Sequence, residues 1–421
     1  MKVLIITYYW PPAGGSGVQR WLKFVKYLQE FGIEPVVYTV ENARYLKQDT
    51  SLLNEVPKNT TILRHPIWEP TKLLFWKKKK QQDKGISNIS KGGLLSFIRG
   101  NFFIPDPKVF WVKPSVNYLQ NYLEHTTIDA IISTGPPHSM HLIAKKIHQK
   151  NDVKWVADFR DPWSDLYYNE DFKQLGFAKK KSRKLEEEVL KNADCILTVS
   201  ATLKQEFLQT AKRVEVLTNG FDDEFLDSND TALDSKFSIS YIGLLPKQSN
   251  PKLLFKVLKA LCDEDAAFKN DLELNFVGDI SAEIKVAIEA NTLAGNTNFV
   301  GYISHQKAIA YQNKSQVLLL LIPNVKNNKG ILTGKLFEYL KAKRPILAIG
   351  PEEGDLATIL KETSAGVIVG FDAEEKLKLQ LLTLYKKYKE ENLEISTANI
   401  EKYHRKELTK KLAFILKSLN S

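Results

Sequence analysis

The chain has 421 residues, 43% hydrophobic and 26% charged, which is typical of a soluble globular protein with more than one core. Two cysteines, Cys195 and Cys262, are too few for a disulfide framework and fit a reducing compartment. The apolar start is too short for a secretion signal, and no run approaches the ~20 apolar residues of a spanning helix. We therefore expect a cytoplasmic protein.

Short apolar runs alternate with amphipathic stretches along the chain, and this alternation predicts parallel α/β sheets. In the first half we expect strands at 2–9, 35–40, 128–134, 153–158 and 195–199, and helices at 18–31 and 182–192. In the second half we expect strands at 237–243, 272–278, 317–322, 345–349 and 366–369, and helices at 250–261, 305–312, 332–343 and 374–389.

A polar, acidic stretch without periodicity follows Asn219 and indicates a linker. We expect two Rossmann-like domains, residues 1–220 and 221–396, that face each other across a cleft in which a ligand binds. A last helix within 397–421 is expected to pack back on the first domain. The net charge of +11 lies almost wholly in residues 1–200, which hold 30 basic and 20 acidic residues. This excess indicates an anionic substrate or surface.

Residues 72–113 interrupt the α/β alternation. They contain ten basic residues, including Lys77 to Lys80, and two acidic ones. Interleaved with these are the aromatic residues Phe75, Trp76, Phe97, Phe102, Phe103, Phe110 and Trp111. Such a segment fits peripheral contact with an anionic membrane, and a solvated loop with ordinary helix packing is the alternative. No nucleic-acid motif accompanies the charge, so we expect no nucleic-acid partner.

A glycine-rich turn, PPAGGSG, lies between the first strand and the first helix. Gly14 and Gly15 allow backbone N–H groups to approach an anion, and the helix N-terminus adds a positive dipole end. The pattern is not the dinucleotide fingerprint. Its place after the first strand of an α/β domain favours a ligand site.

The segment STGPPHSMH follows the strand at 128–134 and begins a helix. His138 is therefore expected at the mouth of the sheet in a polar role. His141 lies on the same helical face, but no Cys or nearby acidic residue completes a metal site, so we expect none.

The segment WVADFRDPW brings Asp158, Arg160 and Asp161 out of a buried strand together. Two interpretations stay open for these residues: a self-neutralising ion pair that fixes the loop, and an acceptor-binding site.

Two further segments lie in or near the second domain. In TNGFD, Asn219 and Gly220 first indicate a turn and second a site at the domain boundary. In GILTGKLFEYL, Thr333 and Gly334 suggest a helix N-terminus that cradles phosphate. Lys335 would then reach a phosphate and Glu338 would accept hydrogen bonds from sugar hydroxyls, whereas a surface ion pair between the two is the alternative.

In this order and spacing, the glycine-rich turn, TGPPHS, NGFD and GKLFEYL…RPILA resemble the retaining GT-B glycosyltransferases of family four. The resemblance covers essentially the whole chain and implies a metal-independent enzyme without a cofactor. It implies a C-terminal domain that binds a nucleotide-sugar donor, with Glu338 on the ribose, and an N-terminal domain that binds the acceptor. Gly14, Gly15 and Asn219 would join Thr333, Gly334 and Glu338 at the donor, and His138 would lie near the transferred sugar.

The chain departs from the family pattern at two places. Gly330 stands where the family has the first Glu of its E-x7-E pair, which concerns the contact to the donor sugar. The family also has an Arg and a Lys after the first strand of the second domain, whereas here only Lys247 is placed for the diphosphate.

Lys247 and Lys335 would stabilise the departing nucleoside diphosphate and His138 would complete the catalytic set. The acceptor is expected to be a glycan or a lipid-linked sugar in cell-envelope or exopolysaccharide synthesis. Two alternatives stay open: a non-catalytic sugar-nucleotide-binding relative and a sugar-nucleotide epimerase, which shares the GT-B architecture.

Overall fold

The structure, a computed structural model, describes residues 1–43, 45, 48–68, 94–164, 174–223, 232–393, 395 and 397–419. It divides into two compact units. Unit 1 comprises Met1–Asn219 and Arg405–Ser421, and unit 2 comprises Gly220–His404. The last helix, expected within 397–421, runs from Arg405 to Lys417 and belongs to unit 1.

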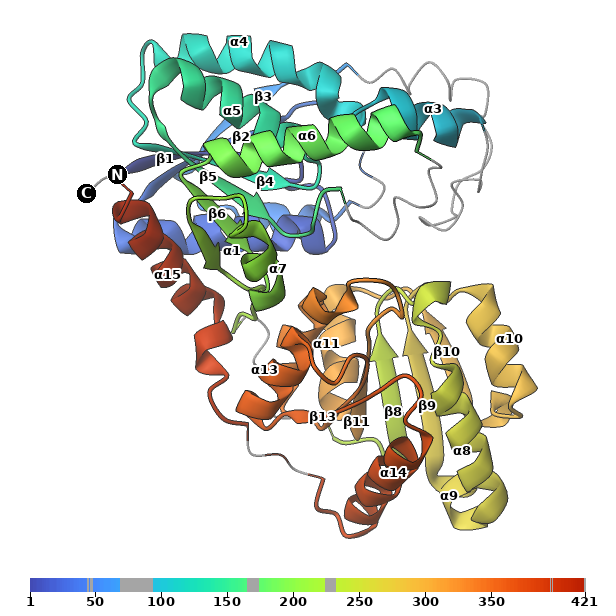
Figure 1. Cartoon of the computed structure of the whole chain (residues 1–421). Helices are drawn as coiled ribbons and strands as arrows, with labels where there is room; N and C mark the ends of the chain where they lie inside the picture. Colours follow the sequence, from blue (N-terminus) through green and yellow to red (C-terminus); the bar gives the residue numbers. More distant parts are fainter. Residues whose placement is uncertain are drawn as a thin grey trace. The chain divides into compact units, whose positions relative to one another are not determined.

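Unit 1 is built on a parallel sheet with the strand order β3-β2-β1-β4-β5-β6-β7 (Figure 1). Its strands are β1 (Lys2–Ile6), β2 (Glu34–Val40), β3 (Thr61–His65), β4 (Ala130–Gly135), β5 (Lys154–Phe159), β6 (Cys195–Thr198) and β7 (Val214–Val216). Its helices are α1 (Ser16–Leu28), α3 (Leu94–Phe102), α4 (Val112–Leu123), α5 (Ser139–Asn151), α6 (Gly176–Asn192), α7 (Ala201–Phe207) and α15 (Arg405–Lys417). Short 3-10 segments are η1 (Gln29–Phe31), η2 (Thr50–Glu55) and η4 (Pro107–Trp111).

Helices cover both faces of the unit 1 sheet. Val3 and Ile5 of β1 pack with α1 and α15, whereas Leu4 and Ile6 pack with α4 and α5. Figure 1 shows α15 lying along α1. A strand that is buried on both faces reads as a continuous apolar run, and this explains the sequence KVLII.

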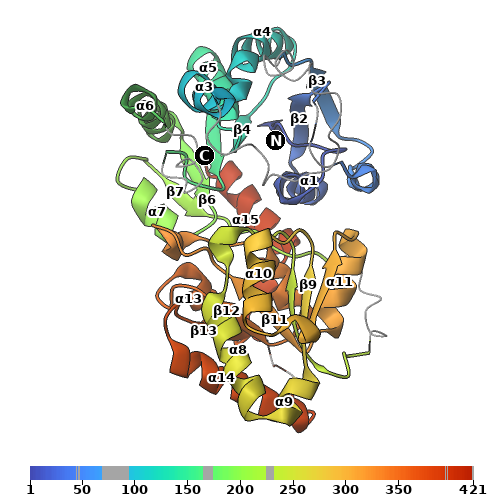
Figure 2. The ribbon, with the colours of Figure 1, turned by 90° about the vertical axis from the view of Figure 1, so that its right-hand side faces the viewer.

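Unit 2 repeats this plan with the strand order β10-β9-β8-β11-β12-β13. Figure 2 labels β9, β11, β12 and β13 of this sheet. Its strands are β8 (Phe237–Ile242), β9 (Leu272–Val277), β10 (Thr297–Gly301), β11 (Val317–Leu321), β12 (Ile346–Ile349) and β13 (Gly366–Val369). Its helices are α8 (Lys252–Glu264), α9 (Ala266–Asp271), α10 (Ala282–Ala290), α11 (His305–Lys314), α12 (Gly334–Ala342), α13 (Asp355–Thr363) and α14 (Glu374–Lys389). Short 3-10 segments are η7 (Lys247–Ser249), η8 (Ala294–Asn296), η9 (Asn328–Gly330) and η10 (Glu401–Tyr403).

In each sheet the strand order reverses beside the first strand, between β1 and β4 and between β8 and β11. Loops at the carboxyl ends of strands that flank such a switch point form the usual ligand site of an open α/β sheet. The ten predicted strands are confirmed, and the sheet edges β3, β7 and β10 are additions.

Candidate functional site

Lys335 lies at the carboxyl end of β8 in unit 2. Its Nζ donates to the Tyr241 hydroxyl at 3.0 Å, and that hydroxyl donates to the Leu244 carbonyl at 2.8 Å. Gly243, with φ of 124°, makes room for the lysine, because a Cβ there would lie 2.4 Å from the Lys335 Cε. In the described part of the chain the ammonium contacts the Tyr241 side chain and no carboxylate, so its charge is available to an anion.

The first turn of α12 lies beside this ammonium. No side chain caps the helix, and the buried Thr333 hydroxyl has no hydrogen-bond partner among the described residues. The space in front of Gly334 is open, since nothing lies within 4 Å of where its Cβ would be. Free backbone N–H groups and the positive dipole end of the helix favour an anion here. Together with Lys335, this turn can hold a phosphate group.

Glu338 lies one turn further along α12 and is half-buried. Its Oε2 accepts from the Gln312 side chain of α11 at 2.9 Å. The structure shows no ion pair between Glu338 and Lys335, because the lysine is held by Tyr241 instead. The carboxylate keeps acceptor positions for hydroxyl groups.

The expected donor site has two further positions: Lys247 for the diphosphate, and Gly330 where the family pattern has a glutamate. Lys247 is exposed in η7, directly after β8. The loop that carries it is tied to the loop after β11, since the Asn324 N–H donates to the Gln248 carbonyl at 3.3 Å. Gly330 is buried at the end of η9 and offers no side chain where the family pattern has a carboxylate.

In unit 1, His138 lies at the carboxyl end of β4 and is 5% exposed. Its ring stacks on Trp163 with centroids 4.7 Å apart, and neither ring nitrogen has a hydrogen-bond partner among the described residues. Burial lowers the pKa of His138 well below its usual value, and the nearby His141 and Arg160 add to this effect. A neutral imidazole with unpartnered nitrogens can bind a hydroxyl group.

His141 lies behind His138 in a buried hydrogen-bond chain. The Trp155 indole N–H donates to Ser133 Oγ at 2.9 Å, and Ser133 Oγ lies 2.8 Å from His141 Nδ1. The serine hydroxyl can donate to Nδ1 or accept from it, according to which ring nitrogen carries the imidazole proton. Burial lowers the pKa of His141 to about 3, so the ring stays neutral.

Gly135 lets the two imidazoles come this close. A Cβ there would lie 2.6 Å from His141 Nε2 and 2.7 Å from His138 Nδ1. Arg160 fixes the same loop, since its guanidinium donates to the carbonyls of Gly135, Pro136 and Gly17 at 3.0, 2.7 and 3.3 Å. Arg160 thus ties the start of α5 to the start of α1.

Asp158 is fully buried and has a complete set of donors. It accepts from Arg20 Nη2 at 2.8 Å and Nε at 3.1 Å, from the Trp21 indole at 2.7 Å and from the Thr134 hydroxyl at 3.0 Å. Arg20 also donates to the carbonyls of Leu217 and Thr218 at 2.9 and 2.8 Å. Asp158 therefore forms its ion pair with Arg20 and not with Arg160, so the pair differs from the self-neutralising one within the segment, and the acceptor-binding role stays a prediction.

The remaining predicted residues of unit 1 lie nearer the surface. Gly15, with φ of 94°, precedes α1, whose N-terminus has no side-chain cap. Gly14 packs against Asp49, with 3.3 Å between its Cβ position and the Asp49 Cβ. Asp161 is exposed, and the Asn219 side-chain oxygen lies 3.4 Å from Arg20 Nη1. The roles given to these residues stay predictions.

Part of the basic and aromatic segment 72–113 lies outside the described residues, including Phe75, Trp76 and Lys77 to Lys80. In the rest, Phe102 is 63% and Phe110 is 42% exposed. Trp111 is instead fully buried and stacks on Tyr38 with centroids 5.1 Å apart. Placing Trp111 on a contact surface was therefore wrong: its ring fills the core under α4. No described helix is long and apolar enough to cross a membrane.

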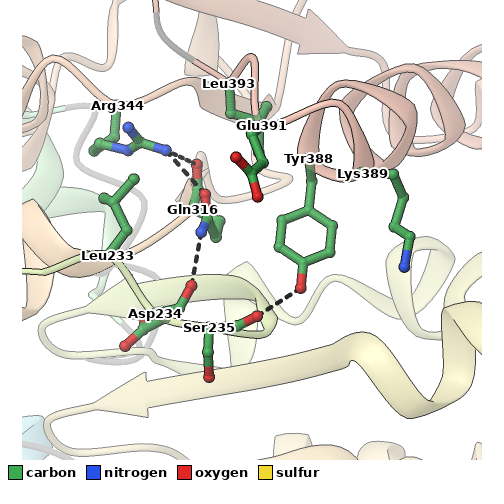
Figure 3. Close-up of a pocket in the computed structure, with 9 residues that line it drawn as sticks. All are labelled: Leu233, Asp234, Ser235, Gln316, Arg344, Tyr388, Lys389, Glu391 and Leu393. Carbon is green, nitrogen blue, oxygen red and sulfur yellow. Dashed lines mark hydrogen bonds between the residues drawn. The ribbon is translucent and has the colours of Figure 1, made fainter.

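A cavity of about 440 Å³ lies at the amino-terminal edge of the unit 2 sheet, opposite the carboxyl-terminal edge at which Lys335 lies (Figure 3). Its polar groups largely pair with one another: Gln316 donates to the Asp234 carbonyl at 2.7 Å, and the Tyr388 hydroxyl to the Ser235 carbonyl at 2.6 Å. Arg344 donates to Gln316 Oε1 at 3.1 Å. These bonds tie the chain before β8 to the starts of β11 and β12. Within the described ranges, no group of three His, Cys, Asp or Glu side chains could hold a metal ion.

Comparison with known proteins bears on both units. Residues 90–225 match the family model described as Glycosyltransferase Family 4. The resemblance to family four is confirmed over this segment. A search of curated proteins finds no match.

Solved structures show the fold of the whole chain. Anabaena HepE in complex with UDP-glucose aligns with a TM-score of 0.62 at 12% identity, covering 99% of this chain and 100% of HepE. WaaG, a glycosyltransferase involved in lipopolysaccharide biosynthesis, aligns with a TM-score of 0.57 at 13% identity over 98% and 99% of the two chains. A protein assigned as a UDP-N-acetylglucosamine 2-epimerase from Listeria monocytogenes aligns at 0.56 and 12% identity over 99% and 96%. The predicted GT-B fold, with two Rossmann-like units, is confirmed.

Sequence reasoning missed the residues that hold the predicted ones in place: Arg20 and Trp21 at Asp158, Ser133 and Trp155 at His141, Tyr241 at Lys335 and Gln312 at Glu338. Arg20 lies in an amphipathic helix that also contains Lys23 and Lys26, so its charge alone does not mark it in the sequence.

Proposed function

We propose that the protein is a glycosyltransferase that moves a sugar from a nucleoside-diphosphate sugar to an acceptor. The observation that carries this proposal is the first turn of α12, where an uncapped helix N-terminus and the Lys335 ammonium lie one turn before Glu338. This arrangement provides positive charge for a diphosphate and an acceptor for hydroxyl groups on a single helix. The family-four segment in unit 1 and the GT-B fold support the same conclusion.

In the proposed reaction the bond between the sugar and the diphosphate breaks, and the anomeric carbon passes through an oxocarbenium-like state. Lys335, Lys247 and the backbone N–H groups at Thr333 and Gly334 stabilise the negative charge of the departing diphosphate without a metal ion. His138, neutral and with unpartnered nitrogens, binds the transferred sugar. The proposal of a retaining reaction rests on the resemblance to family four.

A uridine diphosphate sugar is the first donor to test, because HepE was solved with UDP-glucose. WaaG acts in lipopolysaccharide biosynthesis, and we propose an acceptor of the same kind, a glycan or lipid-linked sugar of the cell envelope. Cys195 and Cys262 are free and buried, which supports a reducing, cytoplasmic location. Exposed Phe102 and Phe110 support a peripheral contact of segment 72–113 with the inner face of the plasma membrane.

A panel of nucleoside diphosphates and their sugars, screened by thermal shift, tests donor binding, because a ligand that binds the folded state raises its melting temperature. Release of nucleoside diphosphate and transfer to glycan acceptors are then measured with and without EDTA. We expect turnover in both conditions. Loss of turnover with EDTA that a divalent ion restores would contradict the metal-free reaction.

The epimerase neighbour and Gly330 each favour one alternative. An epimerase converts the donor sugar with no acceptor present, and product analysis without acceptor detects this conversion. A non-catalytic relative, favoured by the missing carboxylate at Gly330, would bind the donor and release nothing.

A further inference from the structure

Gln312 is a buried polar side chain that donates a hydrogen bond to the half-buried carboxylate of Glu338. It lies in the last turns of α11, is 2% exposed, and donates from Nε2 to Glu338 Oε2 at 2.9 Å. Helices α11 and α12 pack against each other, so the bond joins two neighbouring helices. A buried amide needs a partner, and here the partner is a side chain that also reaches solvent.

The negative charge of Glu338 has no cationic partner among the residues that the structure describes. The two lysines nearest in sequence are engaged elsewhere: Lys335 binds the Tyr241 hydroxyl, and Lys341 binds the Asp222 carbonyl. The neutral Gln312 amide therefore fixes the Glu338 carboxylate. The negative charge and most of the acceptor positions of the carboxylate remain available to a ligand.

Gln316, four residues later, shows what a purely structural buried glutamine does in the same region. It donates to the Asp234 backbone carbonyl and accepts from Arg344, so its amide closes a network at the amino-terminal edge of the sheet (Figure 3). Gln312 instead bonds to the side chain that follows the phosphate-binding turn by one helical turn. The two residues have the same chemistry and similar burial, and differ in what they hold.

We propose that Gln312 is a positioning residue for ribose recognition. It occupies one of the roughly four acceptor positions of the Glu338 carboxylate and fixes the glutamate rotamer. The remaining acceptor positions of the carboxylate then face the two hydroxyls of a ribose whose diphosphate lies on the first turn of α12. Pre-organisation of this kind strengthens binding by avoiding the entropy loss of ordering the side chain. The inference rests on the proposed function of this site.

The test uses the full chain and calorimetric titration. The probes are whichever of UDP, ADP, GDP and CDP stabilises the wild type most, and the matching 2′-deoxy diphosphate. Gln312→Leu removes the donor, and Gln312→Asn retains a polar amide but shortens its reach, should the leucine variant fail to fold. Glu338→Gln removes the charge, and Gln316→Leu is the matched control.

We expect the wild type and Gln316→Leu to prefer the ribose form by about tenfold, the usual size of one hydrogen bond to a charged group. Both Gln312 variants should reduce this preference to about twofold and leave affinity for the deoxy form nearly unchanged. If they keep the full preference while Glu338→Gln loses it, the inference is overturned and the donor site stands.

Three other results also decide the matter. An equal loss in Gln316→Leu would show general loosening and would overturn the positioning role. An unchanged preference in Glu338→Gln would remove Glu338, and Gln312 with it, from ribose recognition while diphosphate binding stands. A wild type that binds none of the four probes would overturn the proposed function and this inference together.

Discussion

Asp158 and Asp161 lie three residues apart and have opposite environments. Asp158 is fully buried with Arg20, whereas Asp161 reaches solvent, although partial desolvation still raises the pKa of its carboxyl group. The sequence predicts that both carboxylates leave the same strand with Arg160, but it cannot show that Arg20, 138 residues away, reaches only the first of them. The partner of a buried charge depends on tertiary packing, and sequence spacing does not reveal it.

This difference predicts unequal effects on stability. Asp158→Ala should lower the free energy of unfolding by about 3–5 kcal/mol, because it leaves the Arg20 guanidinium buried and unpaired. Asp161→Ala should change it by less than about 0.5 kcal/mol, as is usual for a surface position. Urea unfolding of both variants measures the two values. Equal, small effects would show that the Asp158 network does not stabilise unit 1.

At the scale of elements, most of the predicted strands are more deeply buried than the missed ones, and the edge strand β13 is the exception. The central strands, such as β1 and β11, are buried along most of their length and appear in the sequence as apolar runs. The missed strands β3, β7 and β10 are sheet edges, and β10 is half-buried to exposed throughout. An edge strand has one neighbour and a solvated side, so it need not show an apolar run.

The β4–α5 connection should make stability depend on pH. Folding lowers the pKa of His138 and His141, the latter to about 3, so the folded chain binds these protons more weakly than the unfolded chain. The two histidines therefore leave the free energy of unfolding unchanged above pH ~6.5. As the pH falls below this value, the free energy of unfolding decreases by about 1.4 kcal/mol per pH unit for each histidine.

Urea unfolding between pH 5 and 7.5 tests this expectation. Below pH 6.5, His141→Asn should reduce the slope of the unfolding free energy against pH by about 1.4 kcal/mol per pH unit, which corresponds to one proton. His125→Asn, at an exposed position of unit 1, should leave the slope unchanged. A slope in His141→Asn equal to that of the wild type would mean that His141 is not held neutral in the folded state.

At the scale of the whole molecule, the excess positive charge predicts weak binding to anionic membranes through segment 72–113. Each basic residue near such a surface contributes about 1 kcal/mol, screened by salt. Flotation should recover the protein with anionic liposomes at low salt and release it at high salt. Lys77→Glu with Lys78→Glu should abolish flotation, whereas Lys386→Glu with Lys387→Glu, an equal charge change in α14, should not. Equal recovery with neutral liposomes, or none with either, would contradict the contact.

The central claim is that the first turn of α12 and Lys335 bind the diphosphate of a sugar nucleotide. Calorimetric titration of the best-binding nucleoside diphosphate against wild type, Lys335→Met and the control Lys361→Met, at an exposed position of α13, tests it most directly. Loss of one charged donor should weaken binding by about 1.5–3 kcal/mol in Lys335→Met and leave Lys361→Met unchanged. If Lys335→Met binds the diphosphate as tightly as the wild type, the assignment of the donor site to α12 is contradicted.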